Sequence, residues 1–175
     1  LAFRDIHALT DENPNARTDG WEIPNGMSFN LYDGFPDLNM QFNTKDVSFV
    51  TTPCWYKGVT YSDEYRRGFA CKEDLYVPGH FETEMKPGDT IVFSASVGLT
   101  TPSGLKRKFD SYVAKAARIT TYHEQLVHCA DLLKQDRGGH KMITAGFSWL
   151  YTGLLRETLE ALPGLTLYAN GDKAE

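Results

Sequence analysis

The chain has 175 residues, of which 41% are hydrophobic and 23% charged, and its formal net charge is −5. The length allows one domain or slightly more, and the composition is ordinary for a globular protein. The small acidic charge argues against a nucleic-acid partner, which needs a basic face. No apolar run approaches the roughly 20 residues of a membrane-spanning helix, so a membrane is not expected as a partner either.

Charge and composition change near residue 100. Residues 1–98 carry 8 basic and 15 acidic side chains, whereas residues 99–175 carry 10 and 8. Seven of the eight prolines lie at or before Pro102. We infer that two segments of different build meet at this point.

The first segment is predicted to be β. Apolar and polar side chains alternate over residues 27–31, 38–42 and 81–85, and such alternation places the apolar residues on one face of a half-buried strand. Asn25-Gly26 predicts a tight hairpin, because this pair supplies the positive φ angles of the turn. A turn at residues 86–89 should lead into a strand of the buried type over residues 90–97. Short strands between such turns indicate an antiparallel β-sandwich, incomplete in this chain.

The second segment is predicted to begin with a helix at Thr101-Pro102 or Ser103, since proline is tolerated in the first turn of a helix. Apolar residues then recur at helical spacing and should lie on one side. These residues are Leu105, Phe109, Tyr112, Val113 and Ala116.

Two further helices are expected. Residues 121–124 form a capping-box pattern that predicts a helix start, and Arg137-Gly138-Gly139 should end that helix. A third helix is predicted from near Thr152 to Leu162, where Pro163 would kink or end it.

The histidines and cysteines do not form a metal-binding pattern. His123 and His128 are five residues apart, whereas a helical zinc motif needs a spacing of four. The cysteines, Cys54, Cys71 and Cys129, contain no C-x-x-C pair and are odd in number. We expect free thiols and a reducing, cytoplasmic compartment. The sequence has no G-x-S-x-G elbow that would support a serine nucleophile. It also has no phosphate-binding glycine loop, and no cofactor and no metal are expected.

An aromatic patch surrounds Trp55 and Tyr56, with Tyr61 and Tyr65 nearby. Aromatic faces can stack on the apolar side of a sugar ring, so Trp55 and Tyr56 are candidate substrate-binding residues. Core packing in a β-sandwich is the alternative, and the pattern itself favours it.

The segment near the C-terminus carries most of the chemistry. Trp149 is followed by Arg156 and Glu157, and Gly146 and Gly153 bracket the turn that enters the third helix. An arginine beside a carboxylate can lower the pKa of that carboxyl group or bind a hydroxyl. Most helical glutamates are solvated, so Glu157 alone is a weak candidate.

These residues resemble the bacterial glycogen debranching enzyme family of the amylo-α-1,6-glucosidase type. The family pattern is approximately A-G-[YF]-P-W-F, then W-G-R-D-T, then A-L-P-G-L, and residues 145–150, 156–158 and 161–165 follow it. Upstream, residues 1–7, 13–15, 55–56, 73–75 and 78–82 are also similar to the family. The likeness spans nearly the whole chain.

The resemblance implies a mainly β N-terminal part, an antiparallel β-sandwich, followed by α-helices that begin an (α/α)6 barrel. Residues 1–98 would be the later strands of the sandwich. Residues 99–138 would be linker helices, and residues 139–175 the start of a truncated catalytic domain. We therefore expect a piece of a larger enzyme.

The implied activity is an inverting glycoside hydrolase that removes glucose at α-1,6 branch points of glycogen or another branched α-glucan. Such chemistry needs two carboxyl groups. Glu157 and Arg156 are the candidate catalytic residues, and Trp149 would form a wall of the glucose subsite. The second carboxylate, with the remainder of the catalytic domain, would lie beyond residue 175, so the isolated chain should be inactive.

The sequence departs from the family pattern at three places. Ser148 replaces a proline, Leu154-Leu155 replaces Trp-Gly, and Glu157 replaces an aspartate. The extra methylene of Glu157 puts its role in doubt. The alternative functions are a non-catalytic α-glucan-binding module and a purely structural β-sandwich.

Overall fold

The computed structural model describes residues 1–5, 8–116, 119–137, 139–144 and 153–165. The chain divides into two compact units, Leu1–Tyr112 and Val113–Glu175. Each unit is considered by itself.

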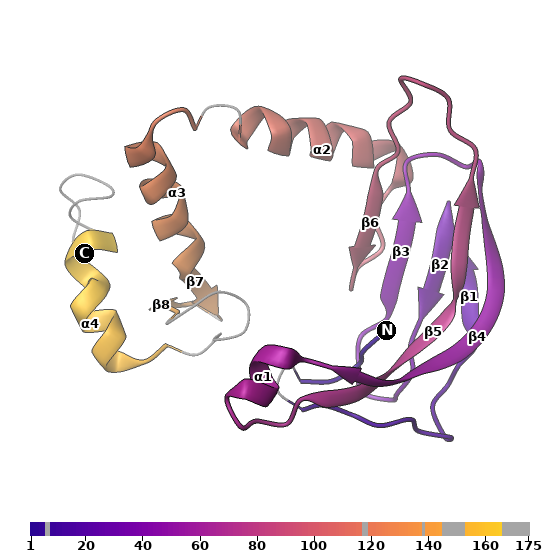
Figure 1. Ribbon diagram of the computed structural model, residues 1–175. Coiled ribbons are helices and arrows are strands. Elements are labelled where there is room, and N and C mark those ends of the chain that lie inside the picture. The colour runs from indigo at the N-terminus through magenta and orange to yellow at the C-terminus, as the bar shows by residue number, and fades with distance from the viewer. Residues whose placement is uncertain (6–7, 117–118, 138, 145–152, 166–175) are drawn as a thin grey trace. The chain divides into compact units, whose positions relative to one another are not determined.

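The first unit is built from two antiparallel sheets (Figure 1), which confirms the β-rich N-terminal part. One sheet has four short strands in the order β1-β2-β3-β6. Their bounds are Gly20–Ile23, Gly26–Phe29, Leu38–Phe42 and Phe93–Ser96. The other sheet is a long two-stranded ribbon of β4, Val47–Thr60, and β5, Lys72–Thr83, connected through the short helix α1, Ser62–Arg66.

Phenylalanine side chains join the two sheets. The ring of Phe29 on β2 lies 5.7 Å from that of Phe49 on β4, and Phe42 on β3 lies 4.9 Å from Phe81 on β5. The alternation of β3 places Phe42 on the face that meets the ribbon, as its sequence pattern predicts. Each buried phenylalanine contributes roughly 1.5–3 kcal/mol through the loss of water contact, so this layer is the core of the unit.

The hairpin predicted at Asn25-Gly26 is confirmed, although the two residues act differently. Asn25 lies in the turn with a φ of 53°, whereas Gly26 already begins β2 and pairs with Ile23. A Cβ atom on Gly26 would lie 1.8 Å from the carbonyl oxygen of Met40. Glycine is therefore required there by the close approach of β3 and not by a positive φ.

Two strand predictions need correction. The strand expected over residues 90–97 is limited to Phe93–Ser96 and is not buried: Phe93 and Val97 are exposed. It lies at the edge of its sheet and pairs with β3 alone. The pattern over residues 81–85 covers the end of β5, which stops at Thr83.

The full length of the β4–β5 ribbon was not foreseen. Two bulges interrupt its register, between Thr51 and Cys54 and between Tyr56 and Val59. Each bulge adds one residue to β4 and breaks the alternation on which strand prediction depends.

Helix α2, Pro102–Ala116, begins with proline at its first position, as expected. Of its predicted apolar stripe only Leu105 is buried, and Phe109, Tyr112 and Val113 are exposed. The pattern therefore predicts the helix correctly but not the burial of its apolar side.

In the second unit, α3 spans Tyr122–Leu133, and its capping box is confirmed: Thr121 accepts from the amide of Glu124, whose side chain accepts from the amide of Thr121. The predicted helix end at residues 137–139 is wrong. The chain leaves the helix after Leu133 and forms a hairpin of β7, Lys134–Arg137, and β8, His140–Ile143, with Gly139 at a φ of 84°.

Helix α4 spans Leu155–Pro163, so it includes Pro163, one residue beyond the predicted end at Leu162, and Gly164 after it still has helical backbone angles. The predicted start at Thr152 lies outside the described residues. Within the described ranges, none of the helices combines the length and apolarity needed to cross a bilayer.

Candidate functional site

The catalytic candidates Arg156 and Glu157 lie in the first turn of α4. Two contacts hold this end of the helix on β8. Gly153 approaches so closely that a Cβ atom would lie 3.1 Å from the carbonyl oxygen of Ile143, and the hydroxyl of Thr158 donates to the same oxygen at 3.4 Å. Arg156 and Glu157 are therefore placed between two points of attachment.

Both candidates are exposed. Successive helical residues are about 100° apart around the helix axis. Glu157 therefore lies next to the face on which Thr158 contacts β8, whereas Arg156 lies on nearly the opposite face. The guanidinium of Arg156 pairs with Glu160 through Nε and Oε1 at 3.0 Å. Its partner in the structure is thus Glu160 and not Glu157. Trp149, the proposed wall of the subsite, lies outside the described residues.

Trp55 and Tyr56, the candidate sugar-binding residues, point to different surroundings. Trp55 is half-buried, and its ring lies 5.4 Å from that of Tyr76. Tyr76 is buried and donates to the carbonyl oxygen of Thr18 at 2.9 Å. Tyr56 is 59% exposed. Only Tyr56 of this pair offers an open ring face for stacking.

Sequence analysis missed a charged cluster that forms around Glu73 on β5. The buried carboxylate of Glu73 on β5 accepts from Arg4 Nε at 2.7 Å and from Arg4 Nη2 at 2.8 Å. The hydroxyl of Tyr61 also donates to Glu73. These donors satisfy the carboxylate and link the N-terminal segment to the two ends of the α1 connection between β4 and β5.

The electrostatics of the cluster follow from its geometry. Hydrogen bonding by Arg4 holds the pKa of Glu73 below its usual range, against the opposing effect of burial. The same carboxylate raises the pKa of Tyr61, whose hydroxyl it accepts from. Because these hydrogen bonds stabilise the ionised form, Glu73 is poorly suited to act as a proton donor. We therefore interpret the cluster as structural.

The next residue, Asp74, acts similarly on the other side of the ribbon. It accepts from the backbone amides of Glu12 at 2.9 Å and Gly58 at 2.8 Å, and these bonds lower its pKa. Gly58 has a φ of 65° within the second bulge. Both acids of the Glu73-Asp74 pair are therefore engaged in holding the chain.

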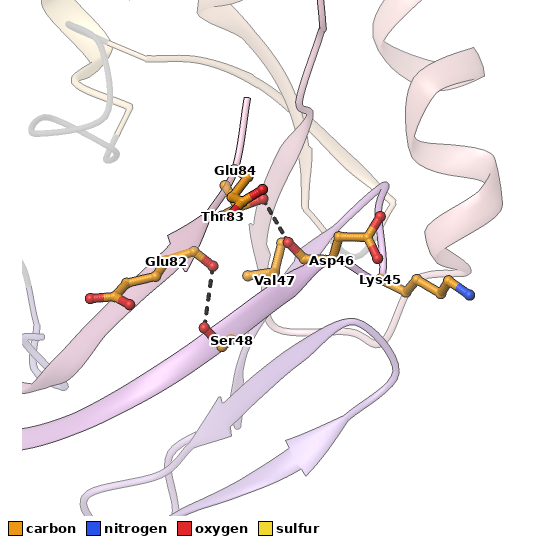
Figure 2. A pocket seen from close by; sticks show the side chains of 7 residues that line it. All are labelled: Lys45, Asp46, Val47, Ser48, Glu82, Thr83 and Glu84. Carbon is orange, nitrogen blue, oxygen red and sulfur yellow. Dashed lines mark hydrogen bonds between the residues drawn. The ribbon is translucent and has the colours of Figure 1, made fainter. Parts of the chain in front are cut away.

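Two of the hollows among the described residues lie in the first unit. The larger, about 570 Å³, is open and lies where β4 begins and β5 ends (Figure 2). Its walls are polar, and across it Thr83 donates to the carbonyl oxygen of Asp46 at 2.7 Å. The smaller, about 240 Å³, lies between the sheets and is lined partly by Phe29, Phe49 and Tyr76.

Neither hollow includes a candidate site residue. Among the residues that the structure describes, histidine, cysteine and acidic side chains nowhere gather in threes that could hold a metal ion. The structure thus leaves Arg156, Glu157 and Tyr56 as accessible candidates.

Residues 1–92 match the family described as "Glycogen debranching enzyme N terminal", which covers more than half of the chain. No curated protein and no solved structure matches.

Proposed function

Because the chain belongs to the glycogen debranching enzyme N-terminal family, we propose that it is part of a glycoside hydrolase acting on α-1,6 branch points of glycogen or a related α-glucan. The family match over residues 1–92 carries this proposal. In it, the two packed sheets belong to a β-sandwich domain, residues 99–138, which include α2 and α3, form the linker, and residues 139–175 begin an (α/α)6 barrel. The rest of the catalytic domain is the partner, and the compartment is the cytoplasm.

Glu157 is the proposed catalytic acid or a close helper of that acid. Hydrolysis of a glycosidic bond needs one carboxyl group to protonate the departing oxygen and a second to activate water. The exposure of Glu157 is compatible with access to substrate. The second carboxylate is proposed to lie outside these residues.

Arg156 is proposed to bind substrate hydroxyl groups. Its pair with Glu160 is largely exposed, and such pairs contribute little, so a sugar can replace Glu160 at small cost. Trp149 is proposed as a wall of the glucose subsite.

Replacement of Glu157 in the parent enzyme tests the assignment. Glu157→Gln should lower glucose release from a branched limit dextrin by about a hundredfold or more, the usual effect of losing a general acid. Glu160→Gln, three residues away on the same helix, is the matched control and should stay within about threefold of the parent. Near-normal activity of Glu157→Gln would remove this residue from the mechanism. The isolated 175 residues should release no glucose.

A second candidate function is α-glucan binding by the sheet unit without chemistry. The open ring of Tyr56 favours it, whereas the packing of Trp55 on Tyr76 favours a structural role for that tryptophan. Affinity electrophoresis in glycogen gels separates the two. A binding module predicts retardation that Tyr56→Ala abolishes and that Tyr65→Ala preserves, Tyr65 being a control residue that is also exposed. Unretarded wild-type protein would exclude this function.

A further inference from the structure

The start of α2 is attached to the four-stranded sheet through one buried amide side chain. We propose that Gln41 is a positioning residue that fixes this start by holding Thr100 against strand β3. The attachment lies wholly within the unit Leu1–Tyr112. It is therefore independent of the proposed hydrolase activity.

All four hydrogen-bonding positions of the Gln41 amide are used. Nε2 donates to the carbonyl oxygens of Pro24 and Thr100, each at 3.0 Å. Oε1 accepts from the backbone N–H of Thr100 at 2.8 Å and from its hydroxyl at 3.0 Å. Three of the four bonds thus hold a single residue, and Gln41 itself is only 1% exposed.

The chemistry of the site requires a primary amide. Two carbonyl oxygens face one end of the side chain and two donors face the other, so only a group with two donors and two lone pairs satisfies them all. A carboxylate would place its charge against carbonyl oxygens, and an apolar side chain would leave buried polar groups unpaired, which is costly.

The connecting segment, residues 97–101, is otherwise held by local hydrogen bonds, from the hydroxyl of Ser96 to the carbonyl oxygen of Gly98 at 2.6 Å and from the amide of Gly104 to that of Thr101 at 2.9 Å. Its apolar residues Val97 and Leu99 are 71% and 65% exposed, and a Cβ atom on Gly98 would meet nothing within 4 Å. The next buried residue is Leu105, in the second turn of α2. Gln41 and Leu105 are therefore the polar and the apolar anchors of the helix start.

Asn43 provides a matched comparison on the same chain. Two residues after Gln41, its Oδ1 accepts from the backbone N–H of Val92 at 2.7 Å, and its Nδ2 donates to the carbonyl oxygen of Thr90 at 3.5 Å. Both amides bind the backbone of a later segment, but Asn43 holds the approach to β6 and Gln41 holds the approach to α2.

Amide hydrogen exchange of the 175-residue chain tests the proposal. Gln41→Met keeps the length of the side chain without its hydrogen bonds, and it should raise exchange over residues 97–105 by about tenfold or more, as expected when one to two net hydrogen bonds are lost. Thr100→Val removes only the hydroxyl contact and should give a smaller increase in the same segment. Asn43→Ala should raise exchange over residues 90–93 and leave residues 97–105 unchanged.

The double variant distinguishes loss of the direct contact between Gln41 and Thr100 from a general loss of stability. Because both substitutions act on one contact, Gln41→Met with Thr100→Val should raise exchange no more than Gln41→Met alone. Additive effects would overturn the proposal. Exchange over residues 97–105 within twofold of wild type in Gln41→Met would also overturn it. If circular dichroism shows that Gln41→Met is unfolded, Thr100→Val decides: an increase confined to residues 97–105 supports the proposal, and no increase contradicts it.

Discussion

The two compact units differ in the side chains that they bury. In Leu1–Tyr112, phenylalanines from two sheets form a shared layer, and a charged cluster fastens the ribbon from within. In Val113–Glu175, the buried residues among those described are Ala130, Thr144 and Leu165. Most large apolar residues described there are exposed. The exposed ones include Val113, Tyr122, Leu126, Leu132, Leu154, Leu155, Leu159 and Leu162.

This difference shows that helical periodicity and a core are separate properties. A capping box and an apolar stripe are enough to specify α3 locally. A helix of this length is only marginally stable in isolation, however, and gains most of its stability from packing against other elements. We therefore expect the first unit to dominate the free energy of unfolding.

The largest effect should come from the phenylalanine layer. Phe42→Ala should lower the free energy of unfolding by about 3–5 kcal/mol, because a buried ring is lost and a cavity remains. Leu159→Ala, at an exposed position of α4, should change it by no more than about 0.5 kcal/mol. Urea denaturation measures both. Equal losses would mean that the second unit has a core that contributes as much to the free energy of unfolding as that of the first unit.

The second largest effect should come from the charged cluster around Glu73. Arg4→Met leaves the carboxylate of Glu73 buried without its main partner, which should cost about 3 kcal/mol. Arg17→Met removes an exposed pair with Asp33, whose atoms are 2.9 Å apart, and should cost less than about 1 kcal/mol. A loss at Arg4 no greater than that at Arg17 would show that the Glu73 cluster does not hold the ribbon.

Acid should weaken the first unit through the same carboxylate. Because the folded-state pKa of Glu73 is lowered from 4.5, its stabilising contribution is complete above that value and is lost as the pH falls through the lower, folded-state pKa. The free energy of unfolding of wild type should therefore fall below pH 4.5 more steeply than that of Glu73→Gln. Parallel pH profiles for the two proteins would assign the acid sensitivity to other groups.

The smallest effect concerns the cap of α3. Thr121→Ala should destabilise this helix by about 1 kcal/mol, the usual cost of losing an N-cap side chain, measured as lost helicity by circular dichroism. Hydrogen bonds from Thr120 and Thr121 lower the pKa of Glu124 to about 2. An NMR titration should therefore place the midpoint of Glu124 near that value in wild type and closer to 4.5 in Thr121→Ala. An unchanged midpoint would show that the side chain of Thr121 does not act on Glu124, since the backbone amides of residues 120 and 121 still donate to it in the variant.

Local features of the fold could be predicted from the sequence, because the interactions that form them lie within a few residues. The Asn25-Gly26 hairpin, the start of α2 at Pro102 and the capping box at Thr121 are of this kind. Features that depend on distant residues could not. Arg4 and Glu73 are 69 positions apart, and the bulges of β4 hide the ribbon by breaking its alternation.

The candidate site follows the same division. The family resemblance was recognisable from short motifs and is confirmed over residues 1–92. The ring of Trp55 packs on Tyr76 and that of Tyr56 is exposed, but sugar binding by either residue stays a prediction. The roles of Glu157, Arg156 and Trp149 stay predictions, since catalysis depends on groups that a helix start alone does not supply.

Incubation of the parent enzyme with a limit dextrin that carries single α-1,6-linked glucose residues tests the central claim most directly. The account predicts free glucose, released first as the β-anomer because an inverting mechanism reverses the configuration at the broken bond. Absence of free glucose, with the branch residues still attached, would contradict it.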